Sequence, residues 1–312
     1  MSSFKTAIIG AGMAGITAAR SLITTGHDVQ IFEKSRGSGG RLASKRSDMG
    51  RVNLGAQAFS TADPLFLDEL NSWQQAGWVE RCTTDSSYWT GTPYMSALTR
   101  NLLGDINTNF ACEIRALSHN SNGWLLHDQQ ARTHGPFQYL IVAIPAPQAE
   151  ILLANCAPEL AEQAACVDMQ PIWMVALGFK QPIALTNNLE LLSNEAIAEV
   201  IHTPQSADHP MQTLMLRANK KWTKEHILDD RQHVIAALTE SLAALLDHPL
   251  PTADSVFAHR WLYALGAMPI ASTLLADAQR GLYIAGDWCG YGDVYSAWHS
   301  GKHAAQQIID NY

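Results

Sequence analysis

Three glycines close to the start of the chain have the spacing that lets a nucleotide diphosphate rest against a helix. Gly10 permits a tight turn from strand to helix, Gly12 lets the backbone approach a pyrophosphate, and Gly15 lets the helix pack closely on the strand. Glu33 follows at a distance where a carboxylate accepts hydrogen bonds from an adenosine ribose. The same turn also contains Ala11, Met13 and Ala14. These residues predict a dinucleotide site, and their spacing alone does not separate NAD from FAD.

The segments around these glycines alternate as strand, helix and strand. Residues 6–9 form a short apolar run, residues 16–24 have apolar side chains at helical spacing, and residues 29–32 return to a strand pattern. This order is the context that the glycine spacing needs in order to bind a dinucleotide. A glycine-rich turn without a ligand is the alternative, and the position of Glu33 at the end of the second strand disfavours it.

A glycine-rich, basic loop follows Glu33 at once, with the sequence KSRGSGGRLASKR over residues 34–46. A nicotinamide-dependent dehydrogenase would normally continue with strands and helices here, so the loop favours FAD. We expect Arg41 to pair with the diphosphate in a bidentate contact, and Gly39 and Gly40 to permit backbone approach. The other basic side chains either help to bind the phosphates or stay solvated; they are Lys34, Lys45 and Arg46.

The C-terminal part of the chain predicts the other side of the same site. Residues 282–285 have a strand pattern, Gly286 and Asp287 form a turn, and residues 295–309 have helical spacing. In flavoproteins with two dinucleotide-binding domains, the acid of such a turn binds the ribityl chain. The next helix points its N-terminus at the N1–C2=O edge of the flavin, where its dipole stabilises negative charge. Asp287 is therefore the expected ribityl ligand, with a plain turn as the alternative.

Composition and charge exclude several other classes of protein. The chain has 312 residues, a net charge of −8 and no run of Lys and Arg longer than two, which argues against a nucleic-acid partner. Five scattered cysteines without a C-x-x-C pair suit a reducing compartment. No apolar run of about 18 residues could span a bilayer, and the glycine-interrupted first run makes a poor signal peptide. We expect a cytoplasmic protein with no membrane partner and no metal site.

Motifs along almost the whole chain resemble those of the bacterial renalases, small FAD-dependent members of the amine-oxidase-like flavoprotein superfamily. The motifs are KSRGSGGR at 34–41, GAQAF at 55–59, MSALTR at 95–100, HGPFQYLIVAIPAPQA at 134–149, HRWLYA at 259–264 and GLYIAGDWCGYGDVYSAWHSG at 281–301. On this resemblance we expect further FAD contacts at Ala56, Gln57, Ile114 and Ala297.

The resemblance also implies an activity. Renalases of this type are thought to oxidise 2-dihydro and 6-dihydro isomers of NAD(P)H to NAD(P)+ by hydride transfer to flavin N5, with O2 reduced to hydrogen peroxide. The implied cofactor is noncovalent FAD, and the implied substrate is a small dihydronicotinamide nucleotide. No catalytic side chain is assigned, because the cofactor supplies the reactivity. The aromatic residues that could contact substrate, or simply belong to the core, are Trp261, Tyr263 and Trp288.

Three alternatives remain open from the sequence. A flavin-dependent amine oxidase acting on a small amine shares the fold, but such chains are commonly longer and their flavin-facing lysine has no identifiable counterpart. A flavin-free binding protein of the same fold is disfavoured by the combination of Glu33, Arg41 and Asp287. A covalent bond from Cys289 to the flavin is disfavoured because its motif resembles the noncovalent branch.

We therefore expect an α/β fold in which a Rossmann-type FAD-binding domain carries an inserted α+β substrate domain with an antiparallel sheet. The FAD-binding domain should comprise residues 1–57, 95–156 and 266–312, and the substrate domain residues 58–94 and 157–265. Residues 171–179, 212–218 and 254–264 should supply strands of the inserted sheet, and residues 229–246 a helix. The basic stretch at 217–226 either attracts a substrate phosphate or is a solvated loop.

Overall fold

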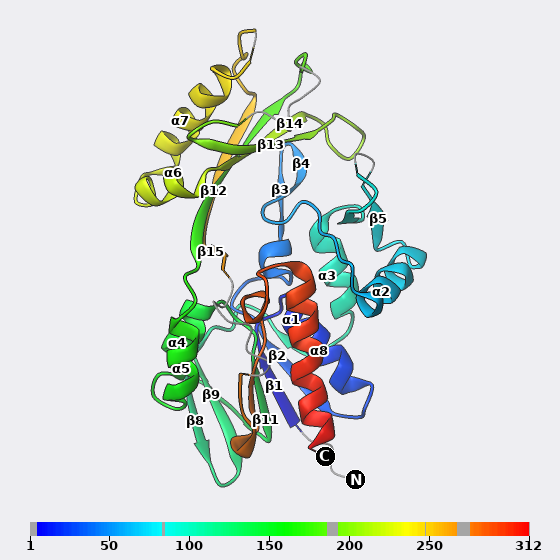
Figure 1. The fold of residues 1–312 in the computed structure, drawn as a ribbon, viewed down its shortest axis with the longest axis vertical. Helices are drawn as coiled ribbons and strands as arrows, with labels where there is room; N and C mark the ends of the chain where they lie inside the picture. The colour runs from blue at the N-terminus through cyan, green and yellow to red at the C-terminus, as the bar shows by residue number, and fades with distance from the viewer. Residues whose placement is uncertain (1–4, 83–84, 186–192, 247, 267–274, 312) are drawn as a thin grey trace. The chain divides into compact units, whose positions relative to one another are not determined.

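The structure, a computed structural model, describes residues 5–82, 85–185, 193–246, 248–266 and 275–311 (Figure 1). The chain forms two compact units. Unit 1 comprises Met1–Ala43, Gly55–Asp168 and Gly266–Tyr312, and unit 2 comprises Ser44–Leu54 and Met169–Leu265. Each unit has a hydrophobic core of its own. A membrane-spanning helix is not found among the described residues, because none combines the required length with sufficient apolar character.

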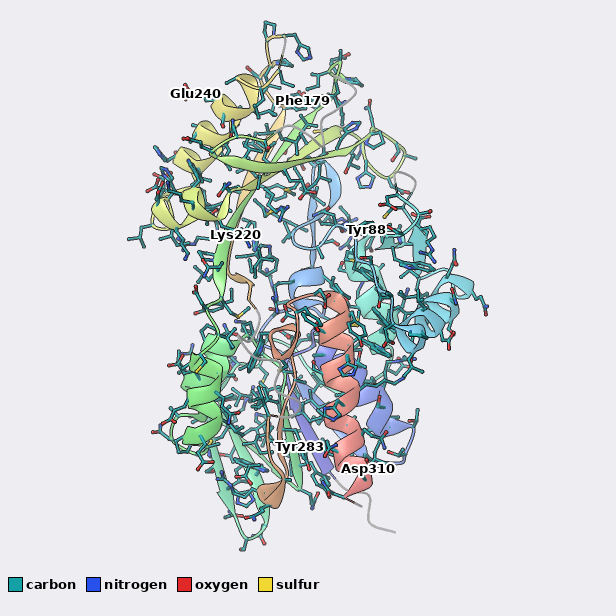
Figure 2. The ribbon with its side chains drawn as sticks, in the orientation of Figure 1. Tyr88, Phe179, Lys220, Glu240, Tyr283 and Asp310 are labelled. Carbon is teal, nitrogen blue, oxygen red and sulfur yellow. The ribbon has the colours of Figure 1, made fainter. Side chains whose placement is uncertain are left out.

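A mostly parallel sheet lies at the centre of unit 1. Its strands, in spatial order, are β16 (Ala276–Asp277), β17 (Leu282–Ile284), β11 (Tyr139–Val142), β1 (Lys5–Ile9), β2 (Asp28–Phe32) and β7 (Thr108–Asn109). All neighbouring pairs are parallel except β16 with β17 at one edge. The strands β1, β11 and β17 are almost fully buried, and Tyr283 of β17 is completely enclosed (Figure 2). This sheet confirms the predicted Rossmann-type fold.

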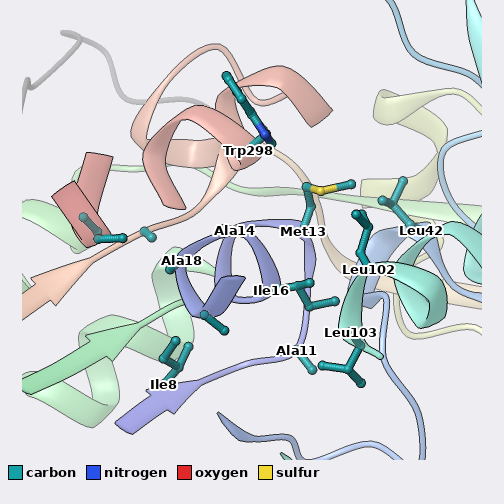
Figure 3. Packing of buried hydrophobic residues seen from close by; sticks show 14 of the residues in the cluster. Ile8, Ala11, Met13, Ala14, Ile16, Ala18, Leu42, Leu102, Leu103 and Trp298 are labelled. Atoms are coloured by element: carbon teal, nitrogen blue, oxygen red, sulfur yellow. The ribbon is translucent and has the colours of Figure 1, made fainter. Parts of the chain in front are cut away.

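Two helices of unit 1, α1 (Met13–Ile23) and α8 (Val294–Asp310), lie side by side (Figure 1). A side chain at Gly301 of α8 would overlap the carbonyl oxygen of Ala14 in α1, so the two backbones approach closely. Met13, Ala14 and Trp298 belong to the shared core at this crossing (Figure 3). Burying a large apolar side chain of this core contributes roughly 1.5–3 kcal/mol to folding.

The segment from residue 64 to residue 103 packs on the same core. It contains α2 (Pro64–Gln75), β5 (Val79–Arg81), β6 (Trp89–Gly91) and α3 (Met95–Leu103). Phe66 of α2 stacks on Trp298 of α8, with ring centroids 4.7 Å apart. Residues 58–94, expected in the substrate domain, therefore belong to unit 1. Aromatic packing against α8 accounts for this difference from the expected division.

The rest of unit 1 consists of a small antiparallel sheet and short helices. The sheet has the strands β8 (Ile114–Asn120), β9 (Gly123–Asp128) and β10 (Thr133–Phe137) in the order β10-β9-β8. The helices are α4 (Ala146–Leu153) and α5 (Pro158–Ala165), with single turns η1 (Gly40–Leu42), η3 (Ala278–Arg280) and η4 (Asp287–Cys289). Because α5 belongs to unit 1, residues 157–168 also lie outside the unit in which they were expected.

Unit 2 is built on a four-stranded antiparallel sheet. Its strands, in spatial order, are β13 (Ile197–Thr203), β14 (Gln212–Ala218), β12 (Gln170–Phe179) and β15 (Ser255–Leu265). On one face, alternate residues of β12 such as Val175 and Leu177 pack with Val234 of helix α7 (Arg231–Ala243). The three predicted strands and the predicted helix are confirmed, whereas β13 and the short helix α6 (Lys220–Glu225) were not predicted.

The other face of this sheet is covered by a hairpin from far earlier in the chain. The hairpin comprises β3 (Ser44–Ser47) and β4 (Gly50–Asn53), and its residues Met49 and Val52 pack with Met174 and Phe257. Residues 44–54, expected in the FAD-binding domain, therefore belong to unit 2. The apolar side chains at this end of the basic loop explain the difference, because the sheet offers them a partner.

Candidate dinucleotide site

Two of the three glycines are required by the turn between β1 and α1. Gly10 has a φ of +107°, and its N–H donates to the carbonyl oxygen of Phe32 at 2.8 Å. A side chain at Gly10 would overlap the carbonyl oxygen of Ala143, and one at Gly15 would overlap that of Gly10. These positions thus fix the close approach of strand and helix, as the spacing predicts.

Gly12, the third glycine, faces open space. It is the N-cap residue of α1, and no side chain caps this end of the helix. Apart from Gly12 itself and the adjoining backbone, no described atom lies within 4 Å of the position that a Cβ of Gly12 would take. A Cβ at Gly40 would lie 3.7 Å from the Gly12 Cα, which places the glycine-rich loop beside the start of α1. Free helix N–H groups next to unfilled space suit a diphosphate.

The glycine-rich loop also holds a buried hydroxyl, that of Ser38. Its Oγ has no hydrogen-bond partner within the part of the chain that the structure describes. A buried hydroxyl normally has a partner, because leaving it unpaired costs about 1–3 kcal/mol. The neighbouring Gly39 N–H donates to the Ala11 carbonyl oxygen at 2.8 Å, so the loop is attached to the turn. The Ser38 hydroxyl therefore has a hydrogen bond to offer at this turn, a feature that the sequence analysis did not single out within the KSRGSGGR motif.

Glu33 links the glycine turn to the start of the loop. Its Oε2 accepts from the Ala11 N–H at 2.8 Å and its Oε1 from the Ser35 N–H at 2.7 Å, and the residue is 8% exposed. Each carboxylate oxygen has a second lone pair, so hydrogen bonds from ribose hydroxyls remain open to it. The carboxylate therefore has a structural role in addition to the ribose contact that the sequence predicts.

Arg41 and Asp287, assigned to different parts of the dinucleotide, form an ion pair with each other. Arg41 Nη1 donates to Asp287 Oδ2 at 2.6 Å, and Nη2 donates to Oδ1. The side chain of Asp287 is 8% exposed and that of Arg41 27%. The pair joins η1 to η4 across 246 residues of sequence. It brings both predicted residues into one place within unit 1, and each holds the other's orientation.

The main chain around Asp287 closes the turn before α8. The Asp287 carbonyl oxygen accepts from the N–H groups of Gly290 and Gly292, at 2.9 and 3.1 Å. Ser300 of α8 accepts from the Gly286 N–H at 3.0 Å and donates to the Gly286 carbonyl at 2.9 Å. Ser300 therefore positions the Gly-Asp turn, a role that the motifs do not indicate.

The remaining predicted FAD contacts are distributed over unit 1. The Ala56 N–H donates to the Arg41 carbonyl oxygen at 3.1 Å, and Gln57 lies next to it. Ala297 is half-buried in α8, whereas Lys34 is exposed on the loop. Ile114 is buried at the start of β8. Their contacts to FAD remain predictions, and Ala56 and Gln57 are the two that the structure brings beside Arg41.

The aromatic residues predicted to contact substrate differ in accessibility. Trp288 is 1% exposed in unit 1, and its indole N–H donates to the Ile144 carbonyl oxygen at 2.9 Å. It therefore offers no free surface to a substrate in this structure. Trp261 and Tyr263 are half-buried on β15 of unit 2. The indole of Trp261 donates to the Leu54 carbonyl oxygen at 2.8 Å, which fixes its ring.

Cys289 follows Asp287 by two residues, and the sequence leaves open a covalent bond from its sulfur to the flavin. Burial raises the pKa of its thiol far above the ordinary value, and the negative charge of Asp287 raises this pKa further. The thiol is therefore protonated at neutral pH, and a protonated thiol is a poor nucleophile. This environment favours a noncovalent cofactor.

Comparison with protein families assigns most of the chain. Residues 8–71 match the family described as "NAD(P)-binding Rossmann-like domain", and residues 79–309 match "Flavin containing amine oxidoreductase". Among curated proteins, 4,4'-diapophytoene desaturase of Staphylococcus aureus (strain Newman) is 41% identical over 51 residues. This match covers 16% of the present chain and 10% of the desaturase, so the chain matches only about a tenth of that relative's length.

Several solved structures share the fold over nearly the whole chain. A putative protoporphyrinogen oxidase from Exiguobacterium sp. 255-15 has a TM-score of 0.76 and 13% identity, with 100% of both chains covered. An A394C mutant of putrescine oxidase has a TM-score of 0.72 and 13% identity, covering 99% of this chain and 100% of the other. Cyclohexylamine oxidase from Brevibacterium oxydans IH-35A has a TM-score of 0.66 and 14% identity, covering 98% and 100%. At these identities the similarity establishes the fold alone.

Proposed function

Because the chain belongs to the family of flavin-containing amine oxidoreductases, we propose that it is a renalase-like oxidase that acts on 2-dihydro and 6-dihydro isomers of NAD(P)H. FAD is its cofactor. The open space at Gly12, the uncapped start of α1 and the unpaired hydroxyl of Ser38 suit the diphosphate of that cofactor. The choice of a dihydronicotinamide nucleotide as substrate is supported by a different part of the chain, a row of aromatic side chains on one face of strand β15.

The observation that supports a nucleotide substrate best is this face in unit 2. Phe257, His259 and Trp261 alternate along β15 and therefore project from one side of the strand. The rings of His259 and Trp261 are 4.5 Å apart in an edge-to-face arrangement. Lys45 Nζ lies 4.0 Å from the centroid of the Phe257 ring. The positive charge of Lys45 beside these rings would attract the phosphate of a nucleotide and repel a small amine cation.

His259 adds a polar atom to this aromatic face. Its Nε2 is buried and has no hydrogen-bond partner among the described residues. Burial lowers the pKa of His259, and repulsion by Lys45 and Arg231 lowers it further. The imidazole is therefore neutral at physiological pH. A neutral ring with one unpaired nitrogen can hydrogen-bond a carboxamide without repelling the positive charge that develops on the nicotinamide during oxidation.

In this proposal the side chains position the reactants and the cofactor provides the redox chemistry. When bound, FAD accepts the two electrons of the dihydronicotinamide and passes them to O2. Arg41 would hold the diphosphate, Asp287 the ribityl chain, and Trp261 and His259 the substrate base. Overall, a dihydronicotinamide nucleotide, O2 and a proton yield NAD(P)+ and hydrogen peroxide.

Oxidation of a small amine is the second candidate, and the family match itself favours it. The solved structures of similar fold include enzymes named for putrescine and for cyclohexylamine. Both candidates use FAD in the same unit. They differ in the substrate that reduces the flavin, so one experiment compares them directly.

In the test, the purified, flavin-containing protein is mixed in the absence of oxygen with separated nucleotide isomers. These are the 2-dihydro, 4-dihydro and 6-dihydro isomers of NADH and NADPH. Putrescine and cyclohexylamine are run in parallel, and bleaching of the oxidised flavin band is followed in each case. Fast bleaching by a 2-dihydro or 6-dihydro isomer and slow bleaching by the amines are expected. Fast bleaching by an amine alone would replace the proposal by the second candidate.

The variant His259→Gln tests the face of β15 in the same assay. We expect slower bleaching by the isomers and a normal flavin content, because the cofactor site of unit 1 is unchanged. His248→Gln is the matched control: His248 lies before the start of β15, and its side chain bonds the Ala184 carbonyl oxygen at 2.7 Å. If the rate of flavin bleaching fell equally in both variants, a contact between His259 and the substrate would be contradicted.

A further inference from the structure

Three side chains with different donor atoms converge at the small antiparallel sheet of unit 1. Cys112 precedes β8, Asp128 ends β9, and His134 belongs to β10. Cys112 is 3% exposed, and the side chains of Asp128 and His134 are 0% and 21% exposed. None of the three has a role in the proposed oxidation. The cluster therefore requires an explanation of its own.

The three side chains lie within hydrogen-bond distance of one another, and their donor atoms are close to the spacing of ligands around one small ion. Cys112 Sγ lies 3.7 Å from Asp128 Oδ2 and 3.9 Å from His134 Nε2. His134 Nε2 lies 3.0 Å from the same carboxylate oxygen. A tetrahedral zinc ion bonds sulfur at about 2.3 Å and nitrogen or oxygen at about 2.0–2.1 Å, which separates its ligands by roughly 3.3–3.6 Å. Shifts of a few tenths of an ångström would bring all three atoms onto one ion.

Neighbouring groups hold these donors in place. Asp128 Oδ1 accepts from the N–H groups of Gln130 and Arg132, at 2.8 and 3.0 Å, while Oδ2 faces Cys112, His134 and the Arg132 side chain. The Cys112 N–H donates to the Glu33 carbonyl oxygen at 2.9 Å. Such outer contacts orient the ligands of protein metal sites and tune their affinity.

We propose that Cys112, Asp128 and His134 form a binding site for a divalent ion of the zinc class, with water as the fourth ligand. Thiolate, imidazole and carboxylate are the donors that zinc takes in proteins. On binding, the Cys112 thiol releases its proton to solvent and its sulfur bonds the ion. The proposal is independent of the substrate of the flavin.

Arg132 is the competing cation. Its Nε donates to Asp128 Oδ2 at 2.7 Å, which is the oxygen that the ion would use. The Arg132 side chain is 55% exposed, so it can turn into solvent when an ion arrives. We therefore expect that removal of the Arg132 side chain increases the affinity of the site for the metal ion.

A second cluster serves as an internal control. His226, Asp229 and His233 of unit 2 also lie within ligand distance of one another, but their side chains are 30%, 33% and 58% exposed and include no sulfur. Any zinc bound there would have no thiolate ligand. A spectroscopic signature of sulfur coordination thus separates the two clusters.

The experiment titrates the purified, flavin-containing protein with Co2+ and then displaces the cobalt with Zn2+. Tetrahedral cobalt absorbs in the red, where oxidised flavin does not absorb, and a thiolate ligand adds a charge-transfer band in the near ultraviolet that is read from the difference spectrum against the cobalt-free protein. We expect this band in the wild-type protein and in Cys166→Ser, whose cysteine is exposed, and in His233→Gln. We expect Cys112→Ser to lose the band and His134→Gln to bind at least about tenfold more weakly.

Arg132→Ala decides the proposal even where a ligand variant fails to fold. We expect it to bind Co2+ and Zn2+ more tightly than the wild type, with the same band. A wild-type protein without a thiolate-cobalt band would overturn the proposal, as would a band that persists in Cys112→Ser. Weaker binding in Arg132→Ala would also overturn it, because the cluster would then need Arg132 as part of its polar network.

Discussion

Two helices of unit 1 that lie side by side, α1 and α8, begin in opposite ways. α1 begins at Gly12 with no side-chain cap, no acidic residue in its first turn and open space beside it. α8 begins at Asp293, whose carboxylate accepts from the Ser296 N–H at 2.7 Å. An anion is stabilised at a helix N-terminus where the N–H groups are free, and a carboxylate cap satisfies them from within the chain. We therefore expect the phosphates at the start of α1, whereas the Asp293 cap occupies N–H groups of α8 that the expected contact with the N1–C2=O edge of the flavin would use.

The variant with the largest expected effect fills the space at the start of α1. Gly12→Val should abolish FAD retention, because the branched side chain would take the place of the pyrophosphate. No described atom lies near the new Cβ, so the fold should persist. Flavin content of the purified, folded protein is the measurement. A folded Gly12→Val protein with a full complement of FAD would contradict the assignment of α1.

The next effect concerns the ion pair that joins the loop to the turn before α8. Arg41→Ala should weaken FAD binding by roughly 1.5–3 kcal/mol, because a charged hydrogen bond is lost. It also leaves Asp287, which is largely buried, without its cationic partner.

Asp287→Ala should lower FAD affinity and slow anaerobic reduction together. Measurements of equilibrium flavin binding and of stopped-flow flavin reduction distinguish a contact of Asp287 with the ribityl chain from a purely structural role in the turn. A lower melting temperature with normal binding and reduction would assign Asp287 a structural role alone.

A smaller effect is expected at the start of α8. Asp293→Ala removes the N-cap carboxylate and should lower the free energy of unfolding by about 1 kcal/mol. FAD content should stay at the wild-type level, because this end of the helix is satisfied within the chain. Denaturant unfolding and flavin content are measured on one preparation. Loss of FAD without loss of stability would mean that the two helix starts have similar roles.

The smallest effect depends on pH and concerns a third helix start, that of α2. A backbone hydrogen bond from Phe66 lowers the pKa of Asp63, and a hydrogen bond from Tyr295 lowers it further. A depressed pKa in the folded state stabilises the protein above the unfolded value of about 3.9, and this contribution disappears as the pH falls through the folded pKa. Asp63→Asn should therefore unfold with a weaker pH dependence below about pH 4. If the free energy of unfolding depended on acid pH equally in Asp63→Asn and in the wild type, the lowered pKa of Asp63 would be contradicted.

Local sequence signals predicted the elements that position the site. Glycine spacing and short apolar runs identified β1, α1 and β2, because each signal depends on residues adjacent in the chain. The same holds for β12, β14 and β15, whose apolar runs are long. Element type is a local property, and the structure confirms it in these cases.

Which segments of the chain pack against each other could not be predicted in the same way. Residues 44–54 follow a basic loop but pack on the sheet of unit 2, and Phe66 packs on Trp298 from more than two hundred residues away in the chain. Likewise, the motifs predict roles for Arg41 and Asp287 separately but not their ion pair. Cys112, Asp128 and His134 meet only because a β-sheet brings them together. Such contacts depend on tertiary packing, which residue spacing does not encode.

The most direct test of the account is a product balance with the 2-dihydro or 6-dihydro isomer that bleaches the flavin fastest. Substrate is mixed without oxygen, NAD(P)+ is quantified against the flavin reduced, and air is then admitted to measure hydrogen peroxide. We expect equal amounts of NAD(P)+, reduced flavin and, after air, hydrogen peroxide. Flavin that stays oxidised with every dihydronicotinamide isomer, while an amine reduces it, would contradict the proposed function.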